Sequence, residues 1–249
     1  KESEMLGVRG EKIAMIFQDP MTSLNPVLTV EDQIQEVLQF HNHNGLCRAE
    51  MGKKVEEMLE LVGIPAARKT CYPHEFSGGM KQRVVIAMAL ACNPRLLIAD
   101  EPTTALDVTI QAQIMELILE LKEELGMSVL LITHDMGLVA QMADRVLVMY
   151  AGQMIEQAPV LELFDHPAHP YTKALLRSVP GIMDRRDRVL ESIEGMVPEQ
   201  YDMITGCRFA DRCPYRRDIC GRPQTDRMIR HSHLVRCCRA GEVESDAGK

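Results

Sequence analysis

Two adjacent acids end a short apolar run in the middle of the chain. Leu96–Ala99 is entirely apolar, and Asp100 and Glu101 follow it directly. Carboxylates at the end of a buried strand favour a cation or a reacting water as a partner. Asp100 could then hold a magnesium ion, and Glu101 could polarise a water molecule for attack on a phosphate. The plainer interpretation is a strand that reaches the surface at two acids and a proline.

Three further signals are weak when each is taken alone. Ser77-Gly78-Gly79 opens a predicted apolar helix, where bare backbone N–H groups and the positive end of the helix dipole suit a phosphate. An ordinary N-cap with a tight turn gives the same pattern. Gln18 stands in a proline-punctuated loop and His134 follows an apolar strand, and such residues are usually solvated or packed.

Cysteines gather near the end of the chain, at Cys207, Cys213, Cys220, Cys237 and Cys238. Apart from the adjacent Cys237 and Cys238, the intervening gaps of five, six and sixteen residues are wider than the two to four residues typical of zinc pairs. Four thiolates suit a [4Fe–4S] cluster, with zinc, disulfides or free thiols as alternatives. The surrounding segment is rich in arginine and poor in apolar residues, so a metal cross-link would supply stability that packing cannot.

Apolar strands alternate with helices through the first 150 residues. The predicted strands are 11–17, 95–100, 128–133 and 145–150, and the predicted helices are 31–43, 49–62, 80–92, one capped by Asp107, and 137–143. This alternation predicts an α/β fold with a buried parallel sheet, whose ligands lie beyond the carboxyl ends of the strands. A helix near 172–178 and a linker over 180–206 follow.

Composition narrows the class of protein. The chain has 249 residues, a formal charge of −8 and 46% hydrophobic residues, enough for a sizeable core. Its longest apolar run, Val84–Cys92, is far shorter than the roughly 20 residues of a membrane span. The acidic balance argues against broad nucleic-acid binding. The first residue is Lys, and we expect no secretory signal at the front of the sequence.

Taken together and in this order, the motifs resemble the nucleotide-binding subunit of an ATP-binding-cassette (ABC) transporter. The runs Ile16–Pro26 and His169–Thr172, with the cysteine-rich end, resemble the dipeptide and oligopeptide importer branch and its nickel-transporting relatives. The resemblance covers nearly the whole chain. It implies a partial ABC-type P-loop NTPase core over 1–157, with a helical subdomain at about 31–93. A C-terminal extension would cover 158–249, with its four-cysteine cluster at 207–237.

The resemblance also implies a role for each matching residue. Gln18 corresponds to the Q-loop glutamine, Asp100 to the Walker B aspartate and Glu101 to the catalytic base. His134 corresponds to the switch histidine and Asp107 to the D-loop acid. The signature that closes over ATP held by a partner subunit corresponds to Ser77, Gly78 and Gly79, and Gln82 is a further expected ATP-binding residue. The expected ligands of a [4Fe–4S] cluster, or of zinc, are Cys207, Cys213, Cys220 and Cys237, with Cys238 as the spare.

The implied activity is ATP hydrolysis that drives peptide uptake, with ATP and Mg²⁺ as cofactors. The implied partners are a second nucleotide-binding subunit, two membrane permease subunits and, indirectly, an extracytoplasmic substrate-binding protein, with no nucleic acid. The expected location is peripheral, on the cytoplasmic face of the cell membrane. The alternatives are a soluble ABC ATPase of DNA repair or translation, and a non-hydrolysing subunit that only donates a signature.

One departure from the family pattern concerns the phosphate-binding loop. The sequence contains no G-x-x-x-x-G-K-[ST] motif. In the family this loop lies several tens of residues before the Q-loop, which here stands at Gln18. We therefore expect a family member that lacks its first part, and we expect the 249 residues alone not to hydrolyse ATP.

Overall fold

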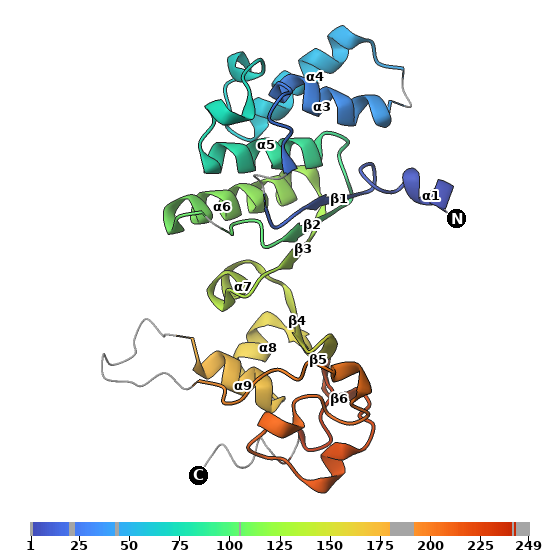
Figure 1. Ribbon diagram of the computed structural model, residues 1–249, viewed down its shortest axis with the longest axis vertical. Helices are drawn as coiled ribbons and strands as arrows, with labels where there is room; N and C mark the ends of the chain where they lie inside the picture. Colours follow the sequence, from blue (N-terminus) through green and yellow to red (C-terminus); the bar gives the residue numbers. More distant parts are fainter. Residues whose placement is uncertain are drawn as a thin grey trace. The chain divides into compact units, whose positions relative to one another are not determined.

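The computed structural model describes residues 2–19, 23–42, 45–104, 106–179, 192–240 and 242. The chain forms two compact units, Lys1–His134 and Asp135–Lys249 (Figure 1). The boundary expected near residue 157, between the core and the extension, stays a prediction. Residues 180–191 of the expected linker lie outside the described residues.

The first unit contains most of the predicted α/β elements. They are α1 (Glu2–Leu6), β1 (Ile13–Ile16), α3 (Val30–Phe40), α4 (Arg48–Leu61), α5 (Gly78–Leu90), β2 (Leu96–Asp100), α6 (Val108–Leu125) and β3 (Ser128–Ile132). The predicted strands and helices of this region are confirmed within a few residues, whereas the short helix α1 was not predicted.

The strands β1, β2 and β3 form a parallel sheet with β2 in the centre. Ala99 of β2 pairs with Ile16 on one side and with Leu131 on the other. Leu97 and Ala99 are fully buried, as expected for a central strand of a covered parallel sheet. Because all three strands run in the same direction, their carboxyl ends meet at one edge of the sheet.

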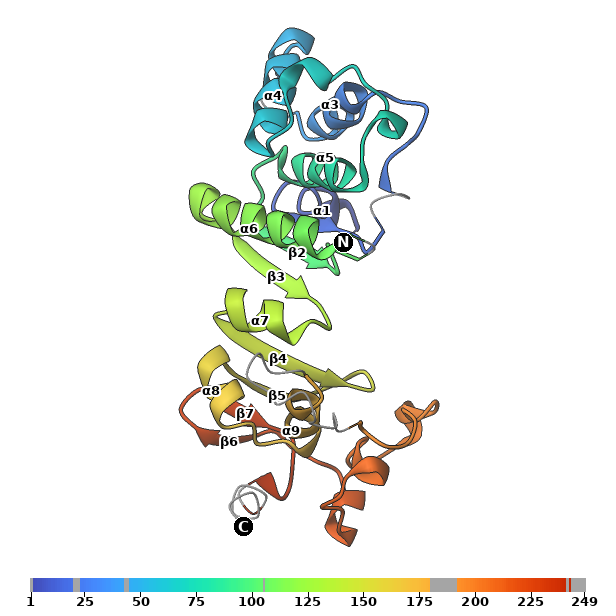
Figure 2. The same ribbon diagram turned by 90° about the vertical axis from the view of Figure 1, so that its left-hand side faces the viewer.

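Helix boundaries in this unit follow local capping chemistry. Thr29 forms a capping box with Asp32 at the start of α3, and Asp107 accepts a hydrogen bond from the N–H of Ile110 at the start of α6. Gly126 ends α6 in the left-handed conformation, with φ of 61°. Helix α5 packs on both β1 and α6, and Figure 2 shows α3 and α4 on the far side of α5 from the strands.

The second unit is built on an antiparallel sheet. Its elements are α7 (Met136–Met142), β4 (Arg145–Tyr150), β5 (Gln153–Pro159), α8 (Val160–Asp165), α9 (Pro170–Arg177), β6 (Arg227–Arg230) and β7 (His233–Val235). The strand order is β4-β5-β7-β6, so the cysteine-rich end contributes two strands to the sheet. The helix predicted near 172–178 is present as α9.

The prediction that Arg145–Tyr150 continues the parallel sheet is wrong. This strand, β4, pairs antiparallel with β5 in the separate four-stranded sheet. Ala151 and Gly152 have φ of 46° and 73°, and two such residues make the tight turn that closes a hairpin. An apolar run indicates burial but does not fix the direction of its partner, and β5 was missed because its sequence carries two glutamines and a glutamate.

An aromatic cluster joins the elements of the second unit. The ring of Phe209 lies 5.3 Å from that of Tyr150 and 5.4 Å from that of Tyr171, between ring centroids. Phe209 is 1% exposed and packs in one core with Ile155 and Leu163. The cysteine-rich segment therefore anchors a large side chain in the core beneath the hairpin.

Candidate active site

Three of the predicted catalytic residues follow the three parallel strands. Gln18 stands two residues after β1, Glu101 directly after β2, and His134 two residues after β3. Since these strand ends share one edge of the sheet, the side chains come together although Gln18 and Glu101 are 83 positions apart. The structure thus assembles one polar site from three separate motifs.

The carboxylate of Glu101 is the centre of this site. Gln18 Nε2 donates a hydrogen bond to Glu101 Oε2 over 2.7 Å. Thr104 Oγ1 donates to the same oxygen over 3.0 Å. His134 Nδ1 lies 3.0 Å from Oε1, and because an ionised carboxylate only accepts, Nδ1 is the donor. The role of Thr104 was not predicted from the sequence, where its only signal was its position in the turn after the acidic pair.

These contacts leave room for one more donor. A carboxylate offers about four lone-pair sites, and three are used here, so Oε1 can still accept a proton donor such as water. The hydrogen bond from His134, followed by those from Thr104 and Gln18, lowers the pKa of Glu101 below its ordinary value. Glu101 is therefore ionised at neutral pH, as a general base must be.

Backbone strain marks the same residue. Glu101 has φ of 42°, in the left-handed region that non-glycine residues rarely adopt. Its N–H donates to the carbonyl of Ile132 over 2.9 Å, which fixes the turn against β3. Strained backbone of this kind clusters at functional sites. The neighbouring Asp100 pairs with Ile132 in the sheet register, and its role as a magnesium ligand stays a prediction.

The predicted signature forms the start of α5. Ser77 is the N-cap residue, and its side chain accepts from the N–H of Met80 over 3.4 Å. A Cβ atom on Gly79 would lie 2.6 Å from Ile110 Cγ2 of α6. Gly79 therefore permits close packing of α5 on α6, beside the cap residue Asp107. This packing role accounts for Gly79 whether or not the turn also contacts a phosphate.

Gln82 differs from the other predicted ATP-binding residues. Its side chain is fully buried in α5. Both of its amide atoms lack a hydrogen-bond partner among the described residues. The predicted contact with ATP receives no support from this position, because a nucleotide binds at an accessible surface.

Comparison with known proteins shows to which family the chain belongs. The family model for ABC transporters matches residues 3–104, and the model described as "Oligopeptide/dipeptide transporter, C-terminal region" matches residues 155–220. A probable peptide ABC transporter ATP-binding protein of Sinorhizobium fredii is 54% identical over 245 residues, which cover 97% of this chain and 72% of that protein. The chain belongs to the ATP-binding subunits of oligopeptide and dipeptide ABC transporters.

Other relatives agree with this assignment. The dipeptide transport ATP-binding protein DppD of Haemophilus influenzae is 54% identical over 92% of the subunit and 69% of its own length. Among solved structures, a dimeric ATP-binding cassette bound to ADP and Pi is 31% identical, with a TM-score of 0.57 over 64% of the subunit and 68% of that chain. The predicted ABC fold is confirmed. In the part of the subunit that the structure describes, no helix is long and apolar enough to span a membrane.

The cysteines at the end of the subunit line one cavity in the second unit. The cysteine cavity is bounded by Cys207, Cys213, Cys220, Cys237 and Cys238. Sγ of Cys220 lies 3.9 Å from Sγ of Cys238, the predicted spare. Burial raises the pKa of Cys207 and of Cys237 to about 11, so these thiols are protonated at neutral pH and a metal would have to displace the protons.

The donor chemistry of the cysteine cavity fits a thiolate-bound metal group, and all eight cysteines of the chain are free of disulfides. The space between the side chains is about 10 Å³, close to that of one water molecule. The thiols must therefore rotate outward to admit a cluster. Among the described residues no three His, Cys, Asp or Glu side chains lie close enough to hold a single metal ion.

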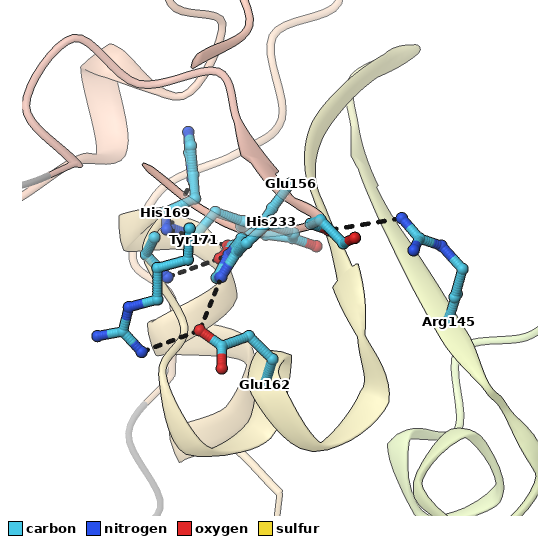
Figure 3. Close-up of polar contacts among 9 residues, drawn as sticks. Arg145, Glu156, Glu162, His169, Tyr171 and His233 are labelled. Carbon is cyan, nitrogen blue, oxygen red and sulfur yellow. Dashed lines mark hydrogen bonds and ion pairs between the residues drawn. The ribbon is translucent and has the colours of Figure 1, made fainter. Parts of the chain in front are cut away.

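A buried polar pair holds the cysteine-rich end on the hairpin (Figure 3). Glu156 of β5 and His233 of β7 are both completely buried, with Oε1 and Nε2 2.8 Å apart. Glu156 also accepts from the N–H groups of Ala168, over 2.6 Å, and His169, over 2.9 Å. This pair was not predicted from the sequence, where its only signal was a glutamate beside the apolar Ile155.

Proposed function

We propose that this subunit hydrolyses ATP to drive the uptake of dipeptides or oligopeptides through a membrane permease. The observation that carries the proposal is the convergence of Gln18, Thr104 and His134 on the carboxylate of Glu101, at the end of the central strand. The names of its relatives, which are peptide and dipeptide transport proteins, support the peptide substrate.

In this proposal Glu101 is the general base. The acceptor site left on Oε1 would take a hydrogen bond from the attacking water and then its proton. His134 orients the carboxylate through Nδ1–H, and its exposed ring would donate from Nε2–H to a phosphate oxygen as the doubly protonated imidazolium. Gln18 holds the other carboxylate oxygen and would report on the membrane partner. Mg²⁺ held by Asp100 would supply charge neutralisation at the phosphates.

The proposed assembly contains two nucleotide-binding subunits. The Ser77-Gly78-Gly79 turn would close over ATP held by the partner subunit, with its backbone N–H groups facing the γ-phosphate. Two membrane permease subunits and, indirectly, an extracytoplasmic substrate-binding protein complete the transporter. The subunit would therefore work at the cytoplasmic face of the membrane, bound through its permease partners.

We further propose a [4Fe–4S] cluster in the cysteine cavity, held by Cys207, Cys213, Cys220 and Cys237. The support is the gathering of thiols in one buried cavity.

Anaerobically purified protein should contain iron and sulfide in about a four-to-four ratio. Cys213→Ser should remove the iron and increase proteolysis within 200–240. Colourless protein with about one zinc per chain would instead leave the zinc alternative. Iron loss in Cys238→Ser but not in Cys237→Ser would show that Cys238, and not Cys237, is the fourth ligand.

The experiment that tests the main proposal uses Glu101→Gln in the assembled transporter. This change keeps the side-chain shape and removes the base, so ATP should still bind while turnover falls by about 10²–10⁴-fold. Glu123→Gln, at an exposed position of α6, serves as the matched control and should leave turnover unchanged. Uptake of a labelled dipeptide should fall in parallel. Near-normal ATP turnover in Glu101→Gln would overturn the catalytic assignment. Normal ATP turnover by the unsubstituted transporter without peptide uptake would overturn the assignment of a peptide substrate.

A further inference from the structure

His169 lies buried at the start of α9 with one ring nitrogen already occupied. Its side chain caps the helix, since Nδ1 accepts a hydrogen bond from the N–H of Tyr171 over 3.0 Å. A neutral imidazole carries its proton on the other nitrogen, so Nε2 is a donor. Burial lowers the pKa of His169 to about 4, which keeps the ring neutral at physiological pH.

The Nε2–H of His169 has no partner among the described residues. The residue is 1% exposed, and Nε2 is a buried atom without a hydrogen bond. A buried donor left unpaired destabilises a fold, so such atoms usually face a ligand, an ion or an ordered water. A water here would need two to four polar partners, and thiols are weak ones.

The ring of His169 forms part of the wall of the cysteine cavity. In Figure 3 the imidazole extends away from the carboxylate of Glu156, while the backbone N–H of His169 donates to that carboxylate over 2.9 Å. Glu156 is in turn held by His233. The backbone of His169 is therefore fixed from one side by a buried carboxyl group, and its side chain reaches the cavity on the other.

We propose that His169 donates a hydrogen bond from Nε2–H to a sulfur atom of the group that the cysteine cavity binds. The proposal rests on the [4Fe–4S] cluster proposed above, and it makes His169 a positioning residue. It gives a function to the first residue of the His169-Pro170-Tyr171 run that the ATPase reaction does not need. It also explains a buried donor that the protein alone leaves unpaired.

The hydrogen bond should change the redox equilibrium of the cluster. Hydrogen bonds to cluster sulfurs help to set the reduction potential. A donor favours the reduced state, which carries one more negative charge, so removing the donor should make reduction less favourable. A net hydrogen bond of about 1 kcal/mol corresponds to a change of about fivefold in the equilibrium constant of one-electron reduction.

The test uses the complete subunit, purified without oxygen, reduced with dithionite and labelled with ¹⁵N-histidine. Pulsed EPR of the reduced cluster should show coupling to one histidine nitrogen, and His169 is the one histidine lining the cavity in the described part of the chain. His169→Phe should abolish the coupling and disfavour reduction about fivefold. His169→Gln retains a hydrogen-bond donor, so its cluster should have a reduction potential closer to that of the unsubstituted protein than the cluster of His169→Phe has. The exposed His166→Phe is the matched control and should change neither reading.

The outcomes separate the two proposals. Protein without iron overturns the cluster and this inference together. An iron-loaded subunit with no histidine coupling, or with the same potential in His169→Phe, overturns only the role of His169. If His169→Phe does not fold, the coupling in the unsubstituted protein and its response to His169→Gln decide the question.

Discussion

Nε2 of His233 lies 2.8 Å from Oε1 of Glu156, and neither side chain reaches solvent. The two residues are 77 positions apart and stand on neighbouring strands, β7 and β5. The other nitrogen of His233 lies 3.4 Å from Glu162 of α8, which also binds Arg230. A buried histidine between two carboxylates therefore fastens the end of the chain to the hairpin and to the turn that carries His169.

Breaking this pair should destabilise the second unit. Glu156→Ala leaves the ring of His233 and the N–H groups of Ala168 and His169 without their acceptor. A buried donor left without its acceptor typically lowers the free energy of unfolding by about 1–3 kcal/mol. Urea unfolding followed by near-ultraviolet circular dichroism of the tyrosines measures the change. Glu199→Ala, at an exposed position, should stay within about 0.5 kcal/mol of the unsubstituted protein, and equal effects of the two changes would contradict the prediction.

The pKa of Glu101 should depend on His134. The hydrogen bond from His134 is the largest cause that lowers this pKa, so His134→Ala should raise it toward the ordinary value. A lowered carboxyl pKa adds stability that is present above the unfolded-state pKa and is lost as pH falls through the folded-state pKa, so the variant should have less of this stability and should lose it completely at a higher pH. Titration of the ¹³C signal of the Glu101 carboxyl measures the shift. Thr104→Val removes the second cause and should give a smaller rise, and an unchanged pKa in His134→Ala would refute the contact.

Adjacent glycines of the signature should respond differently to alanine. Gly79→Ala places Cβ 2.6 Å from Ile110 Cγ2 and should lower the free energy of unfolding by about 1–3 kcal/mol, as overpacking does. Gly78→Ala meets only Leu106 Cδ2 at 3.5 Å, an ordinary contact, and should be tolerated.

A second substitution tests the cause of this difference. In an Ile110→Ala background the clash partner is gone, so Gly79→Ala should lose most of its effect on the free energy of unfolding. The double-mutant cycle, measured by denaturant unfolding, should therefore show coupling between the two positions. Additive effects would mean that contact with Ile110 does not explain the glycine.

ATP hydrolysis should be absent from the 249 residues by themselves. The sequence lacks the G-x-x-x-x-G-K-[ST] loop, whose lysine and backbone N–H groups hold the β- and γ-phosphates. Release of phosphate from magnesium ATP should stay at the level of the Glu101→Gln control. Magnesium-dependent turnover that Glu101→Gln abolishes would show that other residues of this chain hold the phosphates.

Local features of the sequence determined most single elements of the first unit. Capping by Asp107 and the helix stop at Gly126 were both visible, because they depend on residues within one turn of the helix end. The apolar runs placed β2 and β3, with the acidic pair at the end of β2. The order of the motifs along the chain also indicated the family, because this order can be read without knowing which residues are in contact.

Which residues meet in the active site depends on how the strands and helices pack. The sequence did not show that Gln18, Thr104 and His134 share one carboxylate, because that depends on the order of β1, β2 and β3 in the sheet. It misplaced β4 for the same reason, since hydrophobic periodicity indicates burial but not the pairing partner. The Glu156–His233 pair and the orientation of His169 likewise depend on contacts between distant strands, and the chemistry of a buried polar atom is set by the neighbours that folding brings to it.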